Sequence, residues 1–234
     1  LRPASVSPLL LTCEHACGRL PPGVSAGREE RQVLATHHGI DVGAWRLTTE
    51  IGRRLSATAV GGRWSRLWID LNRDLDDPEL IRKEAAGITL SWNRRLTAAE
   101  RKRRIETAHA RYHGDIDLQI RRRLDGGVRP VLLSVHSFTD RFHGRTRGFD
   151  CGVLYDASAG HARKLAAALR QENFTVRYNQ PYSGKLGMMY AIHRHGTAYR
   201  LPCLELEVNQ ARIDSRNKVA RIAPAITRAV ARLL

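Results

Sequence analysis

The sequence contains no long hydrophobic run and few aromatic residues. No apolar run approaches the roughly 20 residues that a helix needs to cross a bilayer, so we expect no membrane segment. The N-terminal residues do not combine a basic segment with a long apolar core, so we expect no signal peptide. Aromatic residues make up only 6% of the chain, which is few for a surface that stacks nucleic-acid bases.

Cysteine is also scarce, because 234 residues contain only four. So few cysteines do not form a disulfide scaffold in a chain of this length. Cys13 and Cys17 have no second pair with matching spacing, and Cys151 and Cys203 fall in apparent strands, where a free thiol behaves as a small apolar side chain. We therefore expect reduced thiols and a cytoplasmic protein.

Acidic residues are outnumbered, with 23 Asp and Glu against 39 Lys and Arg, for a net charge of +16. The arginines are spread over expected helices, in residues 101–104, 121–123 and 212–228, which is typical of solvated helix faces. This distribution argues against a nucleic-acid-binding surface. Positive charge also favours a small anionic substrate.

Internal repeats and low-complexity linkers are absent, and the length suits one sizeable domain, so we predict that residues 1–234 form a single domain. Short apolar segments without sustained alternation predict strands covered on both faces, at 8–13, 58–61, 66–70, 131–135, 151–155, 175–178 and 203–208. Amphipathic segments predict helices at 44–56, 98–124, 157–172 and 212–234, with Thr97 as an N-cap and Gly126–Gly127 ending the second. The alternation predicts an α/β fold: a three-layer α/β/α sandwich around a mixed, mostly parallel sheet.

Histidines follow two of the predicted strands, His15 after LLLTCE and His136 within VLLSVHSF. Ligands collect at the carboxyl ends of parallel strands, so the two imidazoles can meet there. Two histidines with nearby carboxylates are the usual ligands of catalytic zinc, although either histidine can also be an ordinary hydrogen-bonded residue. No HExxH helix is present.

Ser137 and Cys13 are alternative nucleophiles beside these histidines. Neighbouring residues in a strand point to opposite faces, and the chain has no G-x-S-x-G elbow. Serine catalysis at Ser137 is therefore a weaker alternative than a metal site.

The segment LELEV carries two carboxylates, Glu205 and Glu207, on one face of a predicted strand. A buried carboxylate is costly unless it is paired or has a task. One of the two can act as a general base toward water on the metal, and the other can pair with an arginine. Near residue 70, Asn72 and Arg73 can fork onto a substrate carboxylate, or Asp70 and Arg73 can form an internal pair.

Five strings occur in the order CEHA, HHGIDVGA, SRLWIDLNRD, SVHSFTDRFHGR and LELEVNQ. From about residue 9 to residue 210, the chain resembles the N-formylglutamate amidohydrolase family, which is similar to zinc carboxypeptidases and aspartoacylases. The resemblance implies their three-layer fold, a Zn²⁺ cofactor and hydrolysis of N-formylglutamate to formate and glutamate, the last step of one histidine-degradation route.

The resemblance implies that His15 and His136 are zinc ligands, with Asp41 or alternatively Glu14 as the third. Glu207 then matches the general base, with Glu205 as the alternative. The substrate-binding residues that it implies are Asn72 and Arg73, which grip the substrate carboxylate, and Ser183 and His195, which lie in a loop and contact the substrate or the developing oxyanion.

The chain also departs from the family, because residues 14–17 are Glu-His-Ala-Cys where other members carry Pro-His-Ser-Gly. The departure leaves a different N-acyl amino acid or a small peptide as an alternative substrate. A further alternative is a non-catalytic protein of the same fold that binds anions or nucleic acid.

Overall fold

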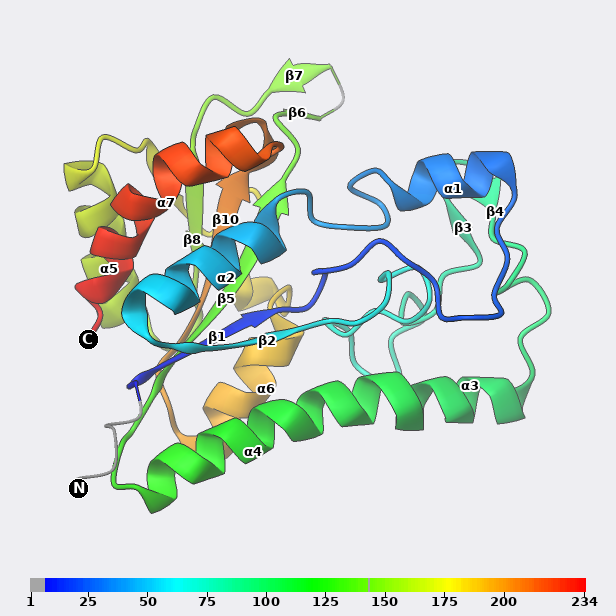
Figure 1. The fold of residues 1–234 in the computed structure, drawn as a ribbon, viewed down its shortest axis with the longest axis horizontal. Helices are drawn as coiled ribbons and strands as arrows, with labels where there is room; N and C mark the ends of the chain where they lie inside the picture. Colours follow the sequence, from blue (N-terminus) through cyan, green and yellow to red (C-terminus); the bar gives the residue numbers. More distant parts are fainter. Residues whose placement is uncertain (1–6, 143) are drawn as a thin grey trace.

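A six-stranded sheet forms the centre of the computed structural model, which describes residues 7–142 and 144–234. The strands lie in the order β2-β1-β5-β10-β8-β9 (Figure 1). Their bounds are β1 Leu9–Cys13, β2 Thr58–Gly61, β5 Val131–Phe138, β8 Cys151–Leu154, β9 Val176–Tyr178 and β10 Cys203–Asn209. Neighbouring strands are parallel except β10 and β8. The predicted mixed, mostly parallel sheet is confirmed.

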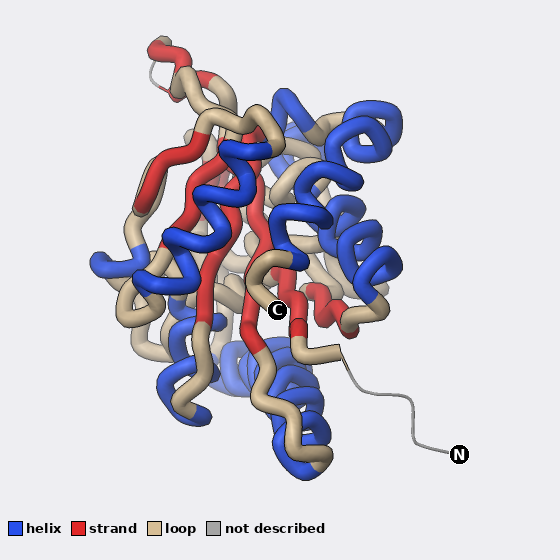
Figure 2. Tube along the Cα trace, turned by 90° about the vertical axis from the view of Figure 1, so that its left-hand side faces the viewer, coloured by secondary structure: helices blue, strands red, loops and turns tan. Residues whose placement is uncertain are grey.

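Helices cover both faces of this sheet, so the predicted three-layer sandwich is also confirmed. One face packs against α2 (Ala44–Leu55), α5 (Ala159–Gln171) and α7 (Arg216–Ala231). The other face packs against α4 (Arg111–Asp125) and α6 (Tyr190–Tyr199). Figure 2 shows the strands running side by side between the two sets of helices. Among the described residues, no helix has the length and apolar character that a bilayer-spanning helix requires.

The alternating side chains of β10 decide on which face its carboxylates lie. Leu204 and Leu206 are fully buried in the core beneath α2, α5 and α7, and each such leucine contributes about 1.5 to 3 kcal/mol by its burial. The pleat therefore turns Glu205 and Glu207 toward the face that α4 and α6 cover. Burial of the leucines on one face of β10 thus determines that both glutamates lie on the opposite face.

The predicted helix at residues 98–124 consists of three consecutive parts. These are α3 (Ala98–Arg104), a π-helical segment (Ile105–Ala110) and α4. The predicted N-cap is confirmed, because Thr97 Oγ1 accepts a hydrogen bond from the N–H of Glu100 at 3.1 Å. The helix ends at the predicted glycine pair, where Gly127 has a φ of 75°.

The strand predicted at residues 66–70 is wrong, because this segment forms turns. Its apolar residues Leu67, Trp68 and Ile69 are nevertheless buried, which explains why the run resembles a strand. The sequence interpretation also missed α1 (Arg28–Leu34) and α6, as well as two short hairpins. The hairpins are β3 (Glu84–Ala85) with β4 (Ile88–Thr89), and β6 (Arg141–Phe142) with β7 (Arg145–Thr146).

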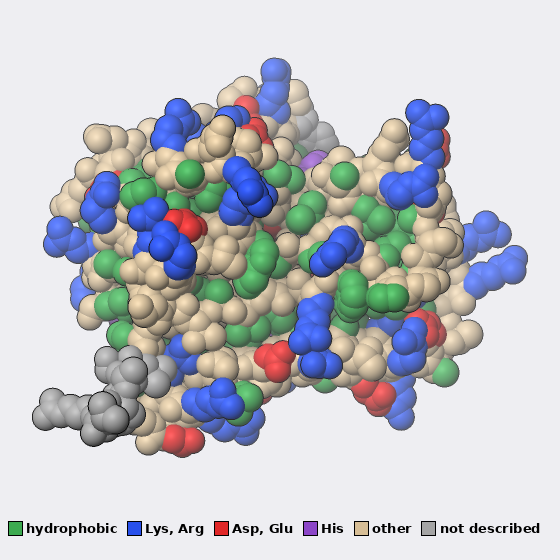
Figure 3. Space-filling model, viewed as in Figure 1, with side chains coloured by type: hydrophobic (Ala, Val, Ile, Leu, Met, Phe, Trp, Pro, Cys, Tyr) green, Lys and Arg blue, Asp and Glu red, His purple; other side chains and the backbone are tan. Residues whose placement is uncertain are grey.

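Two arginines predicted to lie on solvated helix faces are buried instead. The guanidinium of Arg104 stacks 3.3 Å from the ring centroid of Trp68 and donates to Asn93 Oδ1. Arg123 donates to the carbonyl of Ser7 and to Thr58 Oγ1. These two cations therefore stabilise the packing of the long helix. Elsewhere, Figure 3 shows Lys and Arg spread over the visible face without one continuous stripe.

Candidate active site

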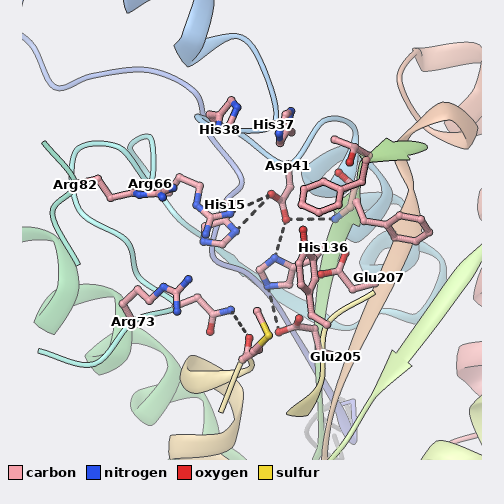
Figure 4. Close-up of a pocket in the computed structure, with 17 residues that line it drawn as sticks. His15, His37, His38, Asp41, Arg66, Arg73, Arg82, His136, Glu205 and Glu207 are labelled. Atoms are coloured by element: carbon pink, nitrogen blue, oxygen red, sulfur yellow. Dashed lines mark hydrogen bonds and ion pairs between the residues drawn. The ribbon is translucent and has the colours of Figure 1, made fainter. Parts of the chain in front are cut away.

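A pocket of about 240 Å³ opens where β1, β5 and β10 bring their polar residues together. Figure 4 shows His15, Asp41 and His136 at its centre. Three arginines lie on one side of this centre and two glutamates on the other; they are Arg66, Arg73, Arg82, Glu205 and Glu207. The three arginines form a basic wall of the pocket, and the two glutamates lie opposite it, beyond the two imidazoles.

The two predicted histidines meet in this pocket. Their ring centroids lie 4.9 Å apart, edge to face. Asp41 lies against both rings, with Oδ1 3.5 Å from His15 Nδ1 and Oδ2 2.7 Å from His136 Nδ1. All three residues are buried. The Nδ1 atoms of both imidazoles therefore converge on one carboxylate.

The opposite nitrogen of each ring also faces a carboxylate. His15 Nε2 lies 2.8 Å from Asp70 Oδ1, and Arg66 holds the other oxygen of Asp70 through two N–H groups at 3.1 and 2.8 Å. His136 Nε2 lies 2.7 Å from Glu14 Oε2. Carboxylates at Nε2 leave Nδ1 as the nitrogen directed at a ligand.

These contacts shift the pKa values of the site in opposite directions. Burial alone lowers the pKa of His136, but Glu205, Asp41 and Glu14 together raise that pKa well above its ordinary value. Burial alone raises the pKa of Asp41, but His15 and His136 hold it far below its usual range. Asp41 is therefore ionised, and the carboxylates around His136 favour the positively charged form of its imidazole.

The donor set at this centre fits a zinc ion. The ligand atoms of His15, Asp41 and His136 all lie within 4.8 Å of one another, and His15 Nδ1 is buried without a hydrogen-bond partner among the described residues. Two imidazole nitrogens and one carboxylate are the protein ligands of many catalytic zinc sites.

Three further carboxylates, those of Glu14, Glu205 and Glu207, are alternative metal ligands. His136, Glu205 and Glu207 form a second group of three residues, but it shares His136 with the first group, and the two nitrogens of that ring already face Asp41 and Glu14. Both oxygens of Glu14 are engaged by Tyr112, Ser134 and His136. The geometry thus supports Asp41 as the third ligand, in preference to Glu14.

Glu205 and Glu207 share one face of β10, next to His136. Glu207 pairs in register with His136, and Glu205 with Ser134. Burial raises the pKa of Glu207 to about 7 and that of Glu205 to about 8. Among the described residues, Oε2 of each is buried without a hydrogen-bond partner. Both carboxylates can therefore accept a proton near neutral pH.

Asn72 and Arg73, predicted to bind the substrate, both line the pocket. Asn72 is fixed by α6, because its Oδ1 accepts the N–H of Ala191 at 2.8 Å. Arg73 is one-third exposed and contacts Asp77 at 3.4 Å. The alternative Asp70–Arg73 pair is wrong, because Asp70 pairs with Arg66 and with His15 instead.

Ser183 and His195 do not line this pocket. His195 lies in α6 rather than in the predicted loop, with Nδ1 2.8 Å from Asp117 and Nε2 2.9 Å from His113. Ser183 precedes a short 3₁₀ turn at Gly184–Leu186. Neither side chain is therefore among the residues that line the pocket, and their contact with a substrate stays a prediction.

Ser137 borders the pocket, and within the described part of the chain its hydroxyl meets no base that could activate it. Its backbone N–H donates to Asp41 Oδ2 at 3.2 Å, and its hydroxyl has no hydrogen-bond partner among the described residues. A serine nucleophile needs an adjacent base. The position suits support of Asp41 rather than nucleophilic attack.

Several residues of the site escaped the sequence analysis. Arg66 lies four positions before Asp70 in the string SRLWIDLNRD, and this spacing was the available signal. Tyr112 reaches Glu14 from α4 across 98 positions, for which the sequence holds no local signal. Phe138, Phe142 and Tyr182 form an aromatic wall of the pocket.

Comparison with known proteins identifies a family and a shared fold. The model of the family described as N-formylglutamate amidohydrolase matches residues 7–213. A curated N-formylglutamate deformylase of Pseudomonas aeruginosa is 29% identical over 178 residues, which are 69% of this chain and 64% of the relative. The N-formylglutamate deformylase of Pseudomonas putida is 29% identical over 169 residues, 64% of this chain and 61% of the relative. The matches thus span less than two thirds of each relative's length.

Solved structures share the fold over almost the whole chain. A gene product of Agrobacterium tumefaciens superposes with a TM-score of 0.87 at 28% identity, covering 97% of this chain and 90% of the other. An N-formylglutamate amidohydrolase from Ralstonia eutropha gives a TM-score of 0.74 at 20% identity, covering 96% and 91%, and this likeness concerns the fold alone. Since the family model spans most of the sequence, the chain belongs to the N-formylglutamate amidohydrolase family.

Proposed function

We propose that this chain is a zinc-dependent amidohydrolase that cleaves N-formyl-L-glutamate to formate and glutamate. Family membership and the names of the two Pseudomonas relatives support this substrate. The observation that carries the proposal is the meeting of His15, Asp41 and His136 beside Glu207 in one pocket. A role in histidine degradation in the cytoplasm belongs to the same proposal, and the four free cysteines fit a reducing compartment.

His15, His136 and Asp41 would hold the metal ion. A bound zinc ion supplies Lewis acidity, which lowers the pKa of water toward neutrality and polarises a carbonyl group. Asp70 and Glu14 keep the two imidazoles turned with Nδ1 toward Asp41. The chain itself therefore orients the ligands before any ion binds.

Glu207 is the general base and acid of the proposed reaction. Because burial raises its pKa to about 7, the carboxylate can take a proton from the attacking water and later return it to the leaving amine nitrogen. Its register position opposite His136 brings it to the same end of the sheet as the metal ligands. Glu205 lies 3.5 Å from His136 Nε2 and is the less suited candidate, since it faces the orienting side of that ring.

Arg73 and Asn72 bind the substrate carboxylate. A guanidinium matches a carboxylate with two parallel hydrogen bonds, and the one-third exposed Arg73 faces the pocket. Fixing the carboxylate on this basic wall sets the distance from the amide to the ligand centre. An anionic substrate also suits the net charge of +16.

Formate release from N-formyl-L-glutamate tests the proposal. Purified protein is assayed before and after chelator treatment, and again after zinc is restored. We expect turnover that the chelator abolishes and zinc recovers. A panel with N-acetylglutamate, N-formylglutamine and a small peptide checks the substrate. Chelator-resistant turnover contradicts the metal assignment, and preference for another panel member contradicts the substrate. A protein that is inactive on the whole panel contradicts the enzyme assignment.

A further inference from the structure

Glu14 is a buried carboxylate with three hydrogen-bond donors around it. Tyr112 donates its hydroxyl to Oε1 at 2.7 Å, Ser134 donates to Oε2 at 2.5 Å, and Nε2 of His136 lies 2.7 Å from Oε2. Only 1% of Glu14 is exposed. An ionised carboxylate only accepts hydrogen bonds, so these three contacts fix both of its oxygens.

The direction of these hydrogen bonds follows from their geometry. Tyr112 and Ser134 each donate a hydroxyl proton to Glu14. Because a carboxylate oxygen accepts, the third contact is the N–H at Nε2 of His136 donating to Oε2 of Glu14.

The contact with Glu14 turns Nδ1 of His136 toward Asp41, where a metal ligand is needed. We propose that Glu14, held by Tyr112 and Ser134, is a positioning residue that orients His136 and strengthens metal binding at the site. The inference rests on the metal site of the proposed function and assigns to Glu14 a role outside the ligand set. A carboxylate on the distal nitrogen also increases the basicity of a ligating imidazole.

The arrangement around the other imidazole supports the same reading. His15 Nε2 meets Asp70, whose second oxygen is held by Arg66. Each ligand imidazole is thus backed by one buried carboxylate, and each carboxylate is held by further donors. Glu14 differs because its donors are neutral hydroxyls, and one of them comes from α4. Through Tyr112, the helix on this face of the sheet takes part in ordering the metal centre.

A metal-affinity measurement tests this role without relying on turnover. Glu14→Gln keeps the size of the side chain and removes its charge, and Tyr112→Phe removes only one donor. Metal-free proteins are titrated with zinc against a chelating dye. We expect zinc affinity to fall roughly 10- to 100-fold in Glu14→Gln, the usual effect of losing such a partner. Tyr112→Phe should cause a smaller loss in the same direction.

Glu30→Gln is the matched control. Glu30 is another buried carboxylate, and it accepts the N–H groups of Gly27 and Ser91 away from the pocket. We expect Glu30→Gln to lower the urea midpoint and leave zinc affinity unchanged. If Glu14 only stabilised the fold, Glu14→Gln would likewise lower the urea midpoint and leave zinc affinity unchanged.

The outcomes separate this inference from the proposed function. Wild-type protein that binds no zinc overturns both. Wild-type and Glu14→Gln proteins that bind zinc equally tightly overturn the positioning role alone. If Glu14→Gln does not fold, Tyr112→Phe decides, because it leaves the carboxylate in place. Unchanged zinc affinity in that variant overturns the inference.

Discussion

Nδ1 of His136 lies 2.7 Å from Oδ2 of Asp41, although the two residues are 95 positions apart in the sequence. His136 belongs to β5, and Asp41 precedes α2, so the contact joins a strand to the loop before the neighbouring helix. The same carboxylate reaches His15, which follows β1. Asp41 therefore links the two imidazoles into one ligand centre.

His136→Ala should abolish both zinc binding and amidase activity. The substitution removes one of the three converging ligands and leaves Asp41 and Glu14 facing each other without the imidazole between them. Metal content by elemental analysis and formate release check the two effects. His37→Ala is the matched control for occupancy, because His37 lines the pocket outside both ligand groups. Full zinc occupancy after loss of both His15 and His136 would place the metal elsewhere.

Glu207→Gln should retain zinc and lose turnover. We expect kcat to fall by about 10²- to 10⁴-fold, the usual contribution of a positioned general base. The companion variant Glu205→Gln should lose less, because Glu205 faces the Nε2 side of His136. Steady-state kinetics at fixed zinc occupancy measures both variants. A larger loss in Glu205→Gln would exchange the two roles.

Arg73→Ala should raise KM for N-formylglutamate more than it lowers kcat. Loss of a charge-assisted hydrogen bond costs about 1.5 to 3 kcal/mol, which corresponds to roughly 10- to 100-fold in KM. Arg73→Lys should recover only part of the loss, because an ammonium cannot match a carboxylate with two parallel bonds. Asp77→Asn removes the present partner of Arg73 and should not raise KM. Equal KM in wild type and Arg73→Ala would exclude this carboxylate contact.

The sequence predicts the strand-borne part of the site and not the part that comes from packing. Histidines at strand ends and the Glu205–Glu207 alternation are periodic signals, and periodicity determines which face a residue occupies. The contact of Tyr112 with Glu14 depends on how α4 lies across the sheet. No local pattern in the sequence predicts this contact between residues 98 positions apart.

Burial also misled the sequence interpretation at three places. Residues 66–70 form a turn whose apolar side chains are buried, so hydrophobicity alone resembles a strand. Arg104 is buried because Trp68 stacks on its guanidinium. His195 lies in a helix although its segment contains glycines, and its ring is held by Asp117 and His113. In each case a tertiary contact outweighs the local composition.

His195→Ala tests whether that residue contacts substrate. The ring is 1% exposed and bonded to Asp117 and His113. Its removal leaves buried His113 without this hydrogen-bond partner, which costs about 1 to 3 kcal/mol in the free energy of unfolding. We expect a lower urea midpoint with KM unchanged. The opposite result, a raised KM with unchanged stability, would restore the substrate contact predicted from the sequence.

The stability of the metal-free protein should depend on the protonation of Glu205 and Glu207. Burial raises their pKa values to about 8 and about 7, above the ordinary value of about 4.3 for glutamate in an unfolded chain. The folded state then binds these protons more tightly than the unfolded state. Their contribution to stability is complete below the unfolded pKa and is lost as the pH rises through the folded pKa. His15 and His136, whose pKa values are also raised, act in the same direction.

Buried His109, His113 and His195, whose pKa values are lowered by burial, act in the opposite direction near pH 6.5. Urea denaturation with a chelator present should therefore show a free energy of unfolding that falls between about pH 7 and about pH 9, where these imidazoles are neutral in both states. Glu207→Gln should flatten the curve near pH 7, because the amide does not titrate. Zinc should reverse the trend, since metal ligands bind in their deprotonated forms and affinity rises with pH. Glu30→Gln, remote from the pocket, should leave the slope unchanged. A metal-free stability that rises over this range would mean that the two glutamates are ionised in the folded protein at neutral pH.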